Sequence, residues 1–417
     1  MNNTNTQQSR TPTLRFPEFV NSGEWVEDEI ENIIKSESSQ LAQNKLKFIA
    51  NGYPVYGADG FIGYISTYSQ NDDYIAIIKD GASVGKLFLY EKESSVLGTL
   101  NCLKIKNINT HNLIWVYYLL QTIDFSIHIK GSGIPHIYFS DYSKEIVPIP
   151  SLPEQRKIAA CLSSLDDIIT LSTQKLAALK KHKKGLMQRL FPNVEEKGEG
   201  RKVPELRFPE FANSGEWVEK KLGEILISVS NGLNFEQINE KTMYPVTRIE
   251  TISDQTVNLS RVGYIKTELD ISSYKLNIGD ILFSNINSLS HIGKTVLIDR
   301  DYGLYHGMNL LRLVVEKQNN FPAFVYYLLN TENVKMDFRS RANQAVNQAS
   351  INQTELEKTK ILLPSLPEQR KIAACLSSLD DLIEAQGKKV EALKKHKKGL
   401  MQRLFPAVVQ DSSLRSE

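Results

Sequence analysis

Cysteine is scarce in this chain of 417 residues: the three present, Cys102, Cys161 and Cys375, have no ligand-like spacing such as C-x-x-C. Neither a disulfide framework nor a cysteine-based zinc site is therefore supported. Long apolar runs are also absent, because no stretch approaches the roughly 20 apolar residues that a membrane span needs. The polar start MNNTNTQQSRTPT lacks the apolar core of a signal peptide, so we expect a cytoplasmic protein.

Catalytic motifs are missing as well. The segment HIGKT at His291 lacks the first glycine of a phosphate loop, because Ser288 occupies that position. No Asn-Pro-Pro-Tyr or Asp-Pro-Pro-Tyr segment marks an amino-group DNA methyltransferase, and no histidine pair has the spacing of a helical metal site. We predict no catalytic residue, no metal site and no cofactor in this chain. A nuclease site made of separated acids leaves no motif, so a self-contained nuclease or methyltransferase stays open as a second interpretation.

The chain does contain a long repeat. The eighteen residues PSLPEQRKIAACLSSLDD begin at Pro150 and again at Pro364, and the copies match at 35 of 43 positions. The eight differences all fall between Ile168 and Ala177. A second echo opens each half, as LRFPEFVNSGEWVE at Leu14 and LRFPEFANSGEWVE at Leu206. The chain is therefore two tandem halves.

Short matches also link the segments between these echoes. In order, they are YPV at Tyr53 and Tyr244, Gly-Lys at Gly85 and Gly293, and VYYLL at Val116 and Val325, with offsets of 191, 208 and 209 residues. An offset that jumps once and then holds is what one insertion in a duplicated domain would leave. We predict two domains of one fold whose surfaces have diverged.

Each copy of the repeat has the heptad pattern of a long helix, with apolar residues alternately four and three positions apart. The seam positions are Ile158, Leu162, Leu165, Ile169, Ser172, Leu176, Leu179, Lys183, Leu186 and Leu190, and in the second copy Ile372, Leu376, Leu379, Ile383, Gln386, Val390, Leu393, Lys397, Leu400 and Leu404. About 38 helical residues extend roughly 57 Å, more than a connecting helix needs. We expect the two helices to pair.

The remaining segments predict mixed α/β domains. YIAIIKDG, KLFLYE, DILFSNI and LLRLVVE are short β-branched or aromatic runs bounded by Gly, Asn and Asp, which indicates strands. Net charge is −3 for residues 28–149 and +1 for 220–363, against +5 and +4 for the two helical repeats. The runs KKHKK at Lys180 and Lys394 could meet phosphates or an acidic partner, but a solvated helix face explains them equally well.

Side chains able to bond base edges are concentrated in both variable segments. RSRANQAVNQASINQ, from Arg339 to Gln353, combines arginine, which suits guanine, with asparagine and glutamine, which suit adenine. The matching place in the first half, IKGSGIPHIYFSDY, is a glycine-rich polar loop. The candidate DNA-binding residues are Asn51, Tyr53, Tyr56, Lys86, Lys130, Ser132, His136 and Tyr138 in the first half, and Arg248, Asn285, Asn287, Lys294, Arg339, Arg341, Asn343, Gln344, Asn347 and Gln348 in the second.

With its doubled PSLPEQRKIA helix and its LRFPEF re-entry, the chain resembles the specificity subunit of Type I restriction-modification systems over residues 14–406. The resemblance implies a non-catalytic subunit with two target recognition domains, each of which reads one half of a split site in double-stranded DNA. It also implies two modification subunits that methylate adenine with S-adenosylmethionine, and restriction subunits that use ATP and Mg.

The resemblance further implies an α+β fold in which two long helices separate the recognition domains and pair as an antiparallel coiled coil with pseudo-twofold symmetry. We expect a disordered N-terminus (1–13), first recognition domain (14–149), first helical spacer (150–192), linker (193–205), second recognition domain (206–363), second spacer (364–406) and tail (407–417). The candidate partner-binding residues are Glu154, Gln155, Arg156, Lys157, Glu368, Gln369, Arg370 and Lys371. A third interpretation is a coiled-coil scaffold with carbohydrate- or protein-binding domains.

Overall fold

The computed structural model describes residues 11–131, 133–192, 202–253, 255–288, 292–345 and 348–406. The chain divides into two compact units: unit 1 comprises residues 1–174 and 387–417, and unit 2 comprises residues 175–386. Both boundaries fall inside a long helix. Each unit therefore contains one variable domain, the first half of one long helix and the second half of the other, an arrangement that the linear domain boundaries did not anticipate.

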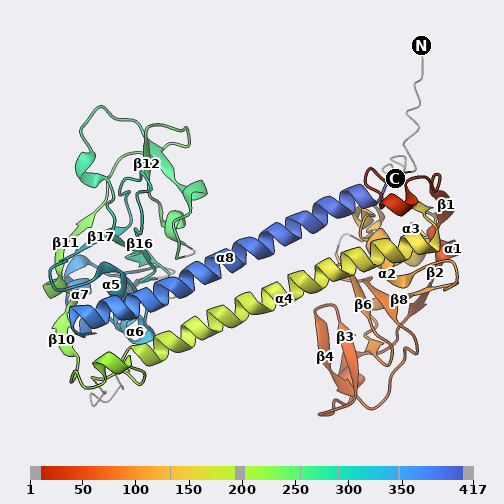
Figure 1. The fold of residues 1–417 in the computed structure, drawn as a ribbon, viewed down its shortest axis with the longest axis horizontal. Coiled ribbons are helices and arrows are strands. Elements are labelled where there is room, and N and C mark those ends of the chain that lie inside the picture. Colours follow the sequence, from red (N-terminus) through yellow and green to blue (C-terminus); the bar gives the residue numbers. More distant parts are fainter. Residues whose placement is uncertain are drawn as a thin grey trace. The chain divides into compact units, whose positions relative to one another are not determined.

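Each copy of the repeat forms one continuous helix of 39 residues, α4 (Leu152–Leu190) and α8 (Leu366–Leu404), as predicted (Figure 1). Every predicted seam position is buried or half-buried, while most residues between them are exposed. Ser172 and Gln386 lie buried among apolar seam positions, at 7% and 8% exposure. No helix in the described part of the chain is both long and apolar enough to cross a membrane.

Within each unit the two helix halves pack antiparallel. In unit 1, Ile158 and Leu162 near the start of α4 share a core with Leu404 near the end of α8. In unit 2, Leu190 at the end of α4 shares a core with Ile372 near the start of α8. These contacts confirm the predicted antiparallel pairing.

The domain of unit 1 is built around a four-stranded sheet with the order β2-β8-β5-β6, a three-stranded sheet with the order β4-β3-β7, and the pair β1-β9. Its strands are β1 (Val26–Glu29), β2 (Ile34–Ser38), β3 (Tyr53–Gly57), β4 (Gly60–Ile65), β5 (Tyr74–Ile78), β6 (Leu87–Tyr90), β7 (Ser95–Val96), β8 (Leu100–Ile105) and β9 (Ile146–Ile149). Its helices are α1 (Ile30–Ile33), α2 (Leu113–Leu120) and α3 (Phe139–Tyr142). Every residue of the central strand β5 is buried, which explains its continuous apolar sequence.

The domain of unit 2 repeats this topology, with the sheet order β11-β17-β14-β16 and the pair β10-β20. Unit 2 also contains the pair β12-β13, the counterpart of β3-β4, and a small sheet with the order β15-β19-β18. Its strands are β10 (Val218–Lys221), β11 (Leu226–Asn231), β12 (Tyr244–Val246), β13 (Gly263–Ile265), β14 (Ile281–Phe283), β15 (Ile286–Asn287), β16 (Thr295–Leu297), β17 (Leu311–Val315), β18 (Asn343–Ala345), β19 (Gln348–Ser350) and β20 (Lys360–Leu363). Its helices are α5 (Pro322–Leu329), α6 (Glu332–Arg341) and α7 (Gln353–Glu357). The two domains therefore share one fold, as predicted.

The extra residues of the second domain are spread over several loops, so the interpretation as one insertion is wrong. Tyr53 of the first YPV segment pairs with Ile65, and Tyr244 of the second pairs with Ile265. The two tyrosines are 191 residues apart in the sequence, whereas their partners are 200 residues apart. The backbone N–H of Gly85 donates to Ile78, and that of Gly293 donates to Ser284, so these two acceptors are equivalent and are 206 residues apart. Loop insertions cost little because each lengthens a connection that is already open to solvent.

The main core of each unit joins its domain to both helix halves. In unit 1, Trp25 lies edge-on to Phe405, with ring centroids 6.4 Å apart. In unit 2, Trp217 lies edge-on to Phe191 at 6.1 Å. Phe405 follows α8 and Phe191 follows α4, so each core is completed by the end of the helix that begins in the other unit.

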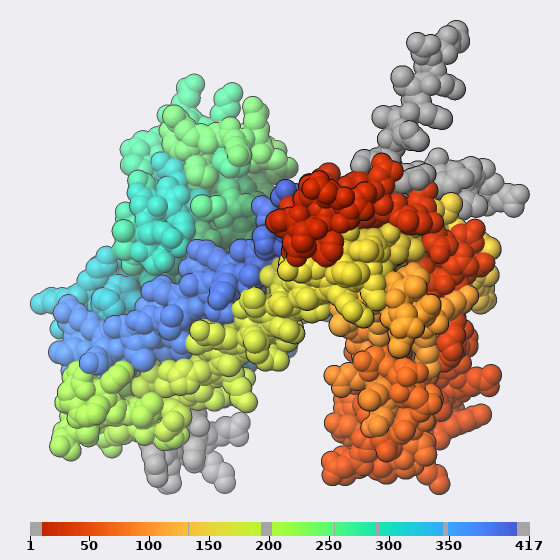
Figure 2. Space-filling model, turned by 45° about the vertical axis from the view of Figure 1, so that its right-hand side comes forward, coloured from red at the N-terminus to blue at the C-terminus, as the bar shows by residue number. Residues whose placement is uncertain are grey.

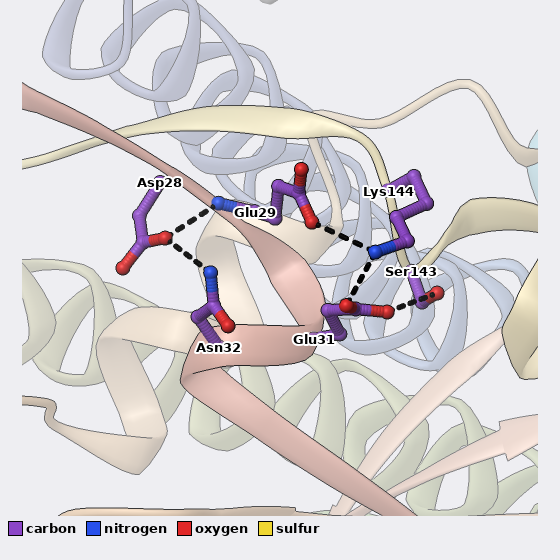
Figure 3. A network of polar contacts seen from close by, with 6 residues as sticks. All are labelled: Asp28, Glu29, Glu31, Asn32, Ser143 and Lys144. Atoms are coloured by element: carbon purple, nitrogen blue, oxygen red, sulfur yellow. Dashed lines mark hydrogen bonds and ion pairs between the residues drawn. The ribbon is translucent and has the colours of Figure 1, made fainter.

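A surface network joins the beginning and end of the domain in unit 1 (Figure 3). The ammonium of Lys144 donates to Glu31 at 2.5 Å and to Glu29 at 3.2 Å, and the Ser143 hydroxyl donates to Glu31. These bonds hold α1 and the end of β1 to the turn before β9, and the bond from Lys144 keeps the pKa of Glu31 below its ordinary value. The network reinforces the β1-β9 pair where the chain enters and leaves the domain.

Candidate nucleic-acid interface

A buried ion pair anchors each domain to its long helix. Arg15 donates from Nε and Nη2 to both carboxylate oxygens of Glu154 at 2.7 Å, and Arg207 makes the same two bonds to Glu368. All four side chains are at most 8% exposed. The bond to Glu154 raises the pKa of Arg15. A fixed bidentate contact thus explains the arginine of the repeated LRFPEF segment.

The glutamine that follows each glutamate is also used inside the chain. Gln155 accepts from the Asn112 backbone and donates to the Thr110 and Pro150 carbonyls, and Gln369 makes the equivalent three bonds. Four of the eight residues predicted to bind a partner, Glu154, Gln155, Glu368 and Gln369, are therefore buried and engaged within the chain. The prediction now depends on the exposed four, Arg156, Lys157, Arg370 and Lys371.

A second contact joins three elements in each unit. In unit 1, the Tyr118 hydroxyl of α2 donates to Asp166 of α4 at 2.7 Å, and Lys397 of α8 pairs with the same carboxylate at 2.6 Å. Tyr327, Asp380 and Lys183 repeat the arrangement in unit 2, at 2.8 Å and 2.5 Å. Burial and then the bonded carboxylate raise the pKa of Tyr118. The repeated VYYLL segment therefore supplies the tyrosine that connects the domain to both helices.

In each unit, part of the predicted base-reading set lies on a shared loop-and-hairpin frame. In unit 1 the loop after β5 bonds to the segment Lys130–His136, with Ile137 N donating to Lys79 O and Gly81 N to Pro135 O. In unit 2 the loop after β14 pairs with β19, which pairs with β18. The bond from Ile351 N to Asn285 O is the counterpart of the bond at Lys79. We call these surfaces frame 1 (residues 79–86, 130–131 and 133–138) and frame 2 (residues 284–288, 292–294, 343–345 and 348–350).

The repeated Gly-Lys dipeptide shapes both frames. Gly85 and Gly293 have φ values of +85° and +78°, which favour glycine. A Cβ at these positions would lie 3.0 Å from Phe125 and 2.7 Å from Phe338, respectively. These two requirements explain the glycine of the repeated dipeptide.

Frame 1 gathers four of the predicted residues. Lys130 donates to Asp141 at 2.7 Å and is 63% exposed, so it can reach another ligand. The rings of His136 and Tyr138 lie edge to face at 5.0 Å, and the Tyr138 side chain is 55% exposed. Lys86 is exposed and lies 5.0 Å from the Phe88 ring centroid. Ser132 lies outside the described residues.

Frame 2 is rich in amides. Ala349 of β19 pairs with Asn287 of β15 on one side and with Gln344 of β18 on the other. Asn343 of β18 pairs with Ser350. The buried Oδ1 of Asn285 accepts no hydrogen bond within the described part of the chain. Gln348 lies in β19, opposite Ala345, and Asn347 lies outside the described residues. Asn343 and Gln344 are exposed, and an exposed amide can bond an adenine edge.

The cations beside frame 2 are largely occupied. Arg339 pairs with Glu332 at 2.8 Å, and Arg341 pairs with Asp337 at 2.7 Å. Lys294 donates to the Ser253 carbonyl at 2.8 Å. Lys335, which the sequence interpretation missed, lies close enough to Arg339 and Lys294 that burial and these cations lower its pKa. Positional motifs alone do not reveal such pairings, because they depend on how α6 packs.

The remaining predicted residues lie away from the frames, on the outer hairpins β3-β4 and β12-β13. Tyr53 contacts Tyr68 at 4.6 Å, and Tyr56 stacks on Tyr90 at 3.8 Å, so both rings take part in local packing. Asn51 is exposed just before β3. Arg248 follows β12 and lines an open cavity. The sequence interpretation missed several neighbours of these residues, namely Phe48, Gln237, Asn239, Lys241 and Arg261.

Comparison with known proteins gives the repeated domain a family. The profile described as "Type I restriction modification DNA specificity domain" matches residues 22–181 and 214–395. The chain belongs to this family. It carries two DNA specificity domains, and each match extends from the variable domain into the following long helix.

Individual relatives agree with the family match. The chain is 46% identical over 193 residues to a putative type I restriction enzyme MjaX specificity subunit of Methanocaldococcus jannaschii, covering 46% of this chain and 45% of that protein. It is 28% identical over 354 residues to the MjaVIII specificity subunit of the same organism, covering 82% and 81%. A crystal structure of the S subunit from M. genitalium has the same fold, with a TM-score of 0.69 at 18% identity, over 95% of this chain and 99% of that one.

Proposed function

We propose that this chain is the DNA-recognition subunit of a Type I restriction-modification complex, acting in the cytoplasm. Each domain reads one half of a bipartite, asymmetric site in double-stranded DNA. The observation that carries this proposal is the contrast between identical anchoring contacts and different side chains on one shared frame. Frame 1 presents lysine, histidine and tyrosine, and frame 2 presents asparagine and glutamine. Two readers of different sequences require this pattern.

Two modification subunits are the proposed direct partners, and restriction subunits complete the complex. Two copies of one helix offer two equivalent docking surfaces to two copies of one protein. The outer faces of α4 and α8 are open to solvent (Figure 2) and include Arg156, Lys157, Arg370 and Lys371. Lys157 pairs with Glu18, and Lys371 makes the same pair with Glu210, both at the exposed surface. These matched patches are the partner-binding surface that we propose.

Chemistry in this proposal belongs to the partners. S-adenosylmethionine, ATP and Mg act in the modification and restriction subunits, while this chain selects the DNA sequence. The isolated chain should therefore neither methylate nor cleave DNA when these cofactors are supplied. Either activity in the isolated chain would favour a self-contained enzyme instead.

The direct test is domain exchange. Residues 28–149 are replaced with the matching domain of a relative, and methylated adenines are mapped across the host genome with and without each gene. One half of the methylated motif should change while the other half stays the same. A motif that changes in both halves would overturn the two-reader proposal, and a chain that never binds DNA with its partners would favour a scaffold.

A further inference from the structure

The outer hairpins of the two domains have one position where different side chains lie over an equivalent glycine. Strand register and isolated backbone bridges align the hairpins by the pairs Tyr53–Ile65 with Tyr244–Ile265, Val55–Gly63 with Val246–Gly263, and Ile49–Tyr64 with Ile238–Tyr264. Phe48 directly precedes Ile49, and Gln237 directly precedes Ile238, the residues that form the aligned bridges. They therefore occupy equivalent positions in units 1 and 2.

In unit 1 this position holds an aromatic ring. A Cβ added at Gly63 would lie 2.5 Å from Cδ1 of Phe48, so the ring rests directly on the glycine backbone. Phe48 is 45% exposed, and Ile49 and Phe61 on the same hairpin segments are 43% and 53% exposed. Large apolar side chains gathered at a surface commonly mark a binding site.

In unit 2 the same place holds a guanidinium group. A Cβ added at Gly263 would lie 2.3 Å from Oε1 of Gln237 and 2.6 Å from Nε of Arg248. Arg248 donates from Nε to Gln237 at 2.7 Å and from Nη2 to Oδ1 of Asn239 at 3.3 Å. These amides are neutral, so they orient the arginine without cancelling its charge.

The environment of Arg248 distinguishes it from the arginines of α6. Within the described part of the chain no carboxylate pairs with Arg248, whereas Arg339 and Arg341 are each held by an acid. Arg248 lines an open cavity of about 770 Å³, together with Lys241, Arg261 and Glu250. An oriented, uncompensated guanidinium at an open cavity is suited to a ligand with two acceptors, and the guanine edge offers O6 and N7.

We propose that this position reads a base in each domain: Phe48 over Gly63 in unit 1, and Arg248 held by Gln237 over Gly263 in unit 2. The inference rests on the proposed function and assigns specificity residues to it. A common backbone site with exchanged chemistry is what two readers of different half-sites need. Arginine indicates a guanine in the second half-site, and the exposed phenylalanine indicates contact with a thymine methyl group in the first.

The test uses the full chain with its modification subunits and sequencing of methylated sites. Arg248→Gln should lower the preference for guanine at one position of the second half-site by about 10- to 100-fold, and leave the first half-site unchanged. Phe48→Ala should relax one thymine position of the first half-site and leave the second unchanged. Matched controls are Arg300→Gln, an exposed arginine elsewhere in unit 2, and Ile108→Ala, a 76% exposed residue of unit 1.

A third variant keeps the arginine and moves it. In Gly263→Ala the new Cβ meets the ends of two flexible side chains, so the fold should persist while the pair is displaced. The same guanine position should relax as in Arg248→Gln. An unchanged thermal unfolding temperature for each variant establishes that the domain is still folded.

Two outcomes would overturn the inference. One is an unaltered motif in folded variants. The other is a uniform loss of affinity for all sequences with a shallower salt dependence, which would identify a phosphate contact. The wild-type complex separates this failure from that of the proposed function: if it methylates no bipartite motif at all, the proposed function itself is wrong.

Discussion

Units 1 and 2 are alike where the domain meets the helices and unlike where it faces outward. The Arg15–Glu154 and Tyr118–Asp166–Lys397 contacts of unit 1 recur in unit 2 with the same residue types and nearly the same distances. Frames 1 and 2 share backbone pairing and the Gly-Lys dipeptide, whereas their other predicted base-reading side chains differ. The repeated residues therefore anchor each domain to the helices, whereas the frames carry the chemistry that differs between the units.

The two helix copies show the same division. Their eight differences lie between Ile168 and Ala177 and at the matching positions of the second copy. The anchoring residues Glu154, Asp166 and Lys183 lie outside that segment. Identity is therefore retained where a helix holds a domain.

The largest effect is expected when both ends of the assembly carry the same domain. A fragment ending at Gly200 lacks residues 387–405, which complete the core of unit 1. Residues 173–191 of a second fragment can replace them, because Lys183, Leu190 and Phe191 match Lys397, Leu404 and Phe405 in the repeat. The fragment should form a dimer, and with the modification subunit it should methylate an inverted repeat of the first half-site.

Sedimentation of the fragment with its modification subunit gives the association state, and methylation mapping gives the motif. A complex that contains one fragment, or methylation at the original asymmetric motif, would contradict this prediction.

The buried ion pairs should be equally important in the two units. Glu154→Ala leaves Arg15 buried without its partner and should cost about 3–5 kcal/mol of local stability in unit 1. Glu368→Ala should have the same effect in unit 2. Hydrogen exchange measured separately on peptides of each unit provides the readout, and Glu24→Ala and Glu216→Ala, exposed residues of the same repeated segment, are the controls. A loss in both units from either change would show that the anchors are not local.

The tyrosine contacts should give a smaller, again matched, effect. Tyr118→Phe and Tyr327→Phe keep the ring and remove the hydroxyl that bonds a carboxylate, so each should cost about 1.5–3 kcal/mol. The Tyr327 hydroxyl also lies 3.2 Å from the Ser377 hydroxyl. Chemical denaturation monitored by hydrogen exchange can compare the two variants directly. Costs that differ by more than about 1.5 kcal/mol would show that the two contacts, despite their geometry, are not energetically equivalent.

The smallest effect on stability should come from the frames. Lys130→Met and Gln344→Ala change exposed side chains and should alter stability by less than about 0.5 kcal/mol. Each should nevertheless change the methylated motif only in the half read by its own unit. Thermal unfolding and methylation mapping on the same samples test both statements, and a variant that alters the opposite half-site would contradict the assignment of frames to half-sites.

The tandem repeat, the two long helices and the resemblance to the family were all predictable from the sequence alone. These features depend on local periodicity and identity, which leave a direct pattern: the heptad positions from Ile158 to Leu190 are buried or half-buried as the spacing predicted. The pairing of frame residues was predictable in part, because the polar residues before β9 and β20 are clustered along the chain. The Gly-Lys and VYYLL matches were visible as patterns, but their roles were not.

Which side chains remain available to a ligand depends on tertiary contacts and was not predictable from the sequence. The sequence PEQRK at the start of α4 favours an exposed polar turn, yet Glu154 and Gln155 are both buried. Arg15 of the LRFPEF segment bonds Glu154, and Asn112 at the start of α2 bonds Gln155. Arg339 and Arg341 resemble base readers in sequence, but helix α6 brings Glu332 and Asp337 within bonding distance. Arg248 lies outside the polar segment 339–353, and in the described part of the chain its side chain is held by two amides, Gln237 and Asn239, and by no carboxylate. Charge compensation and burial depend on neighbours distant in sequence, so they are settled only when the chain is folded.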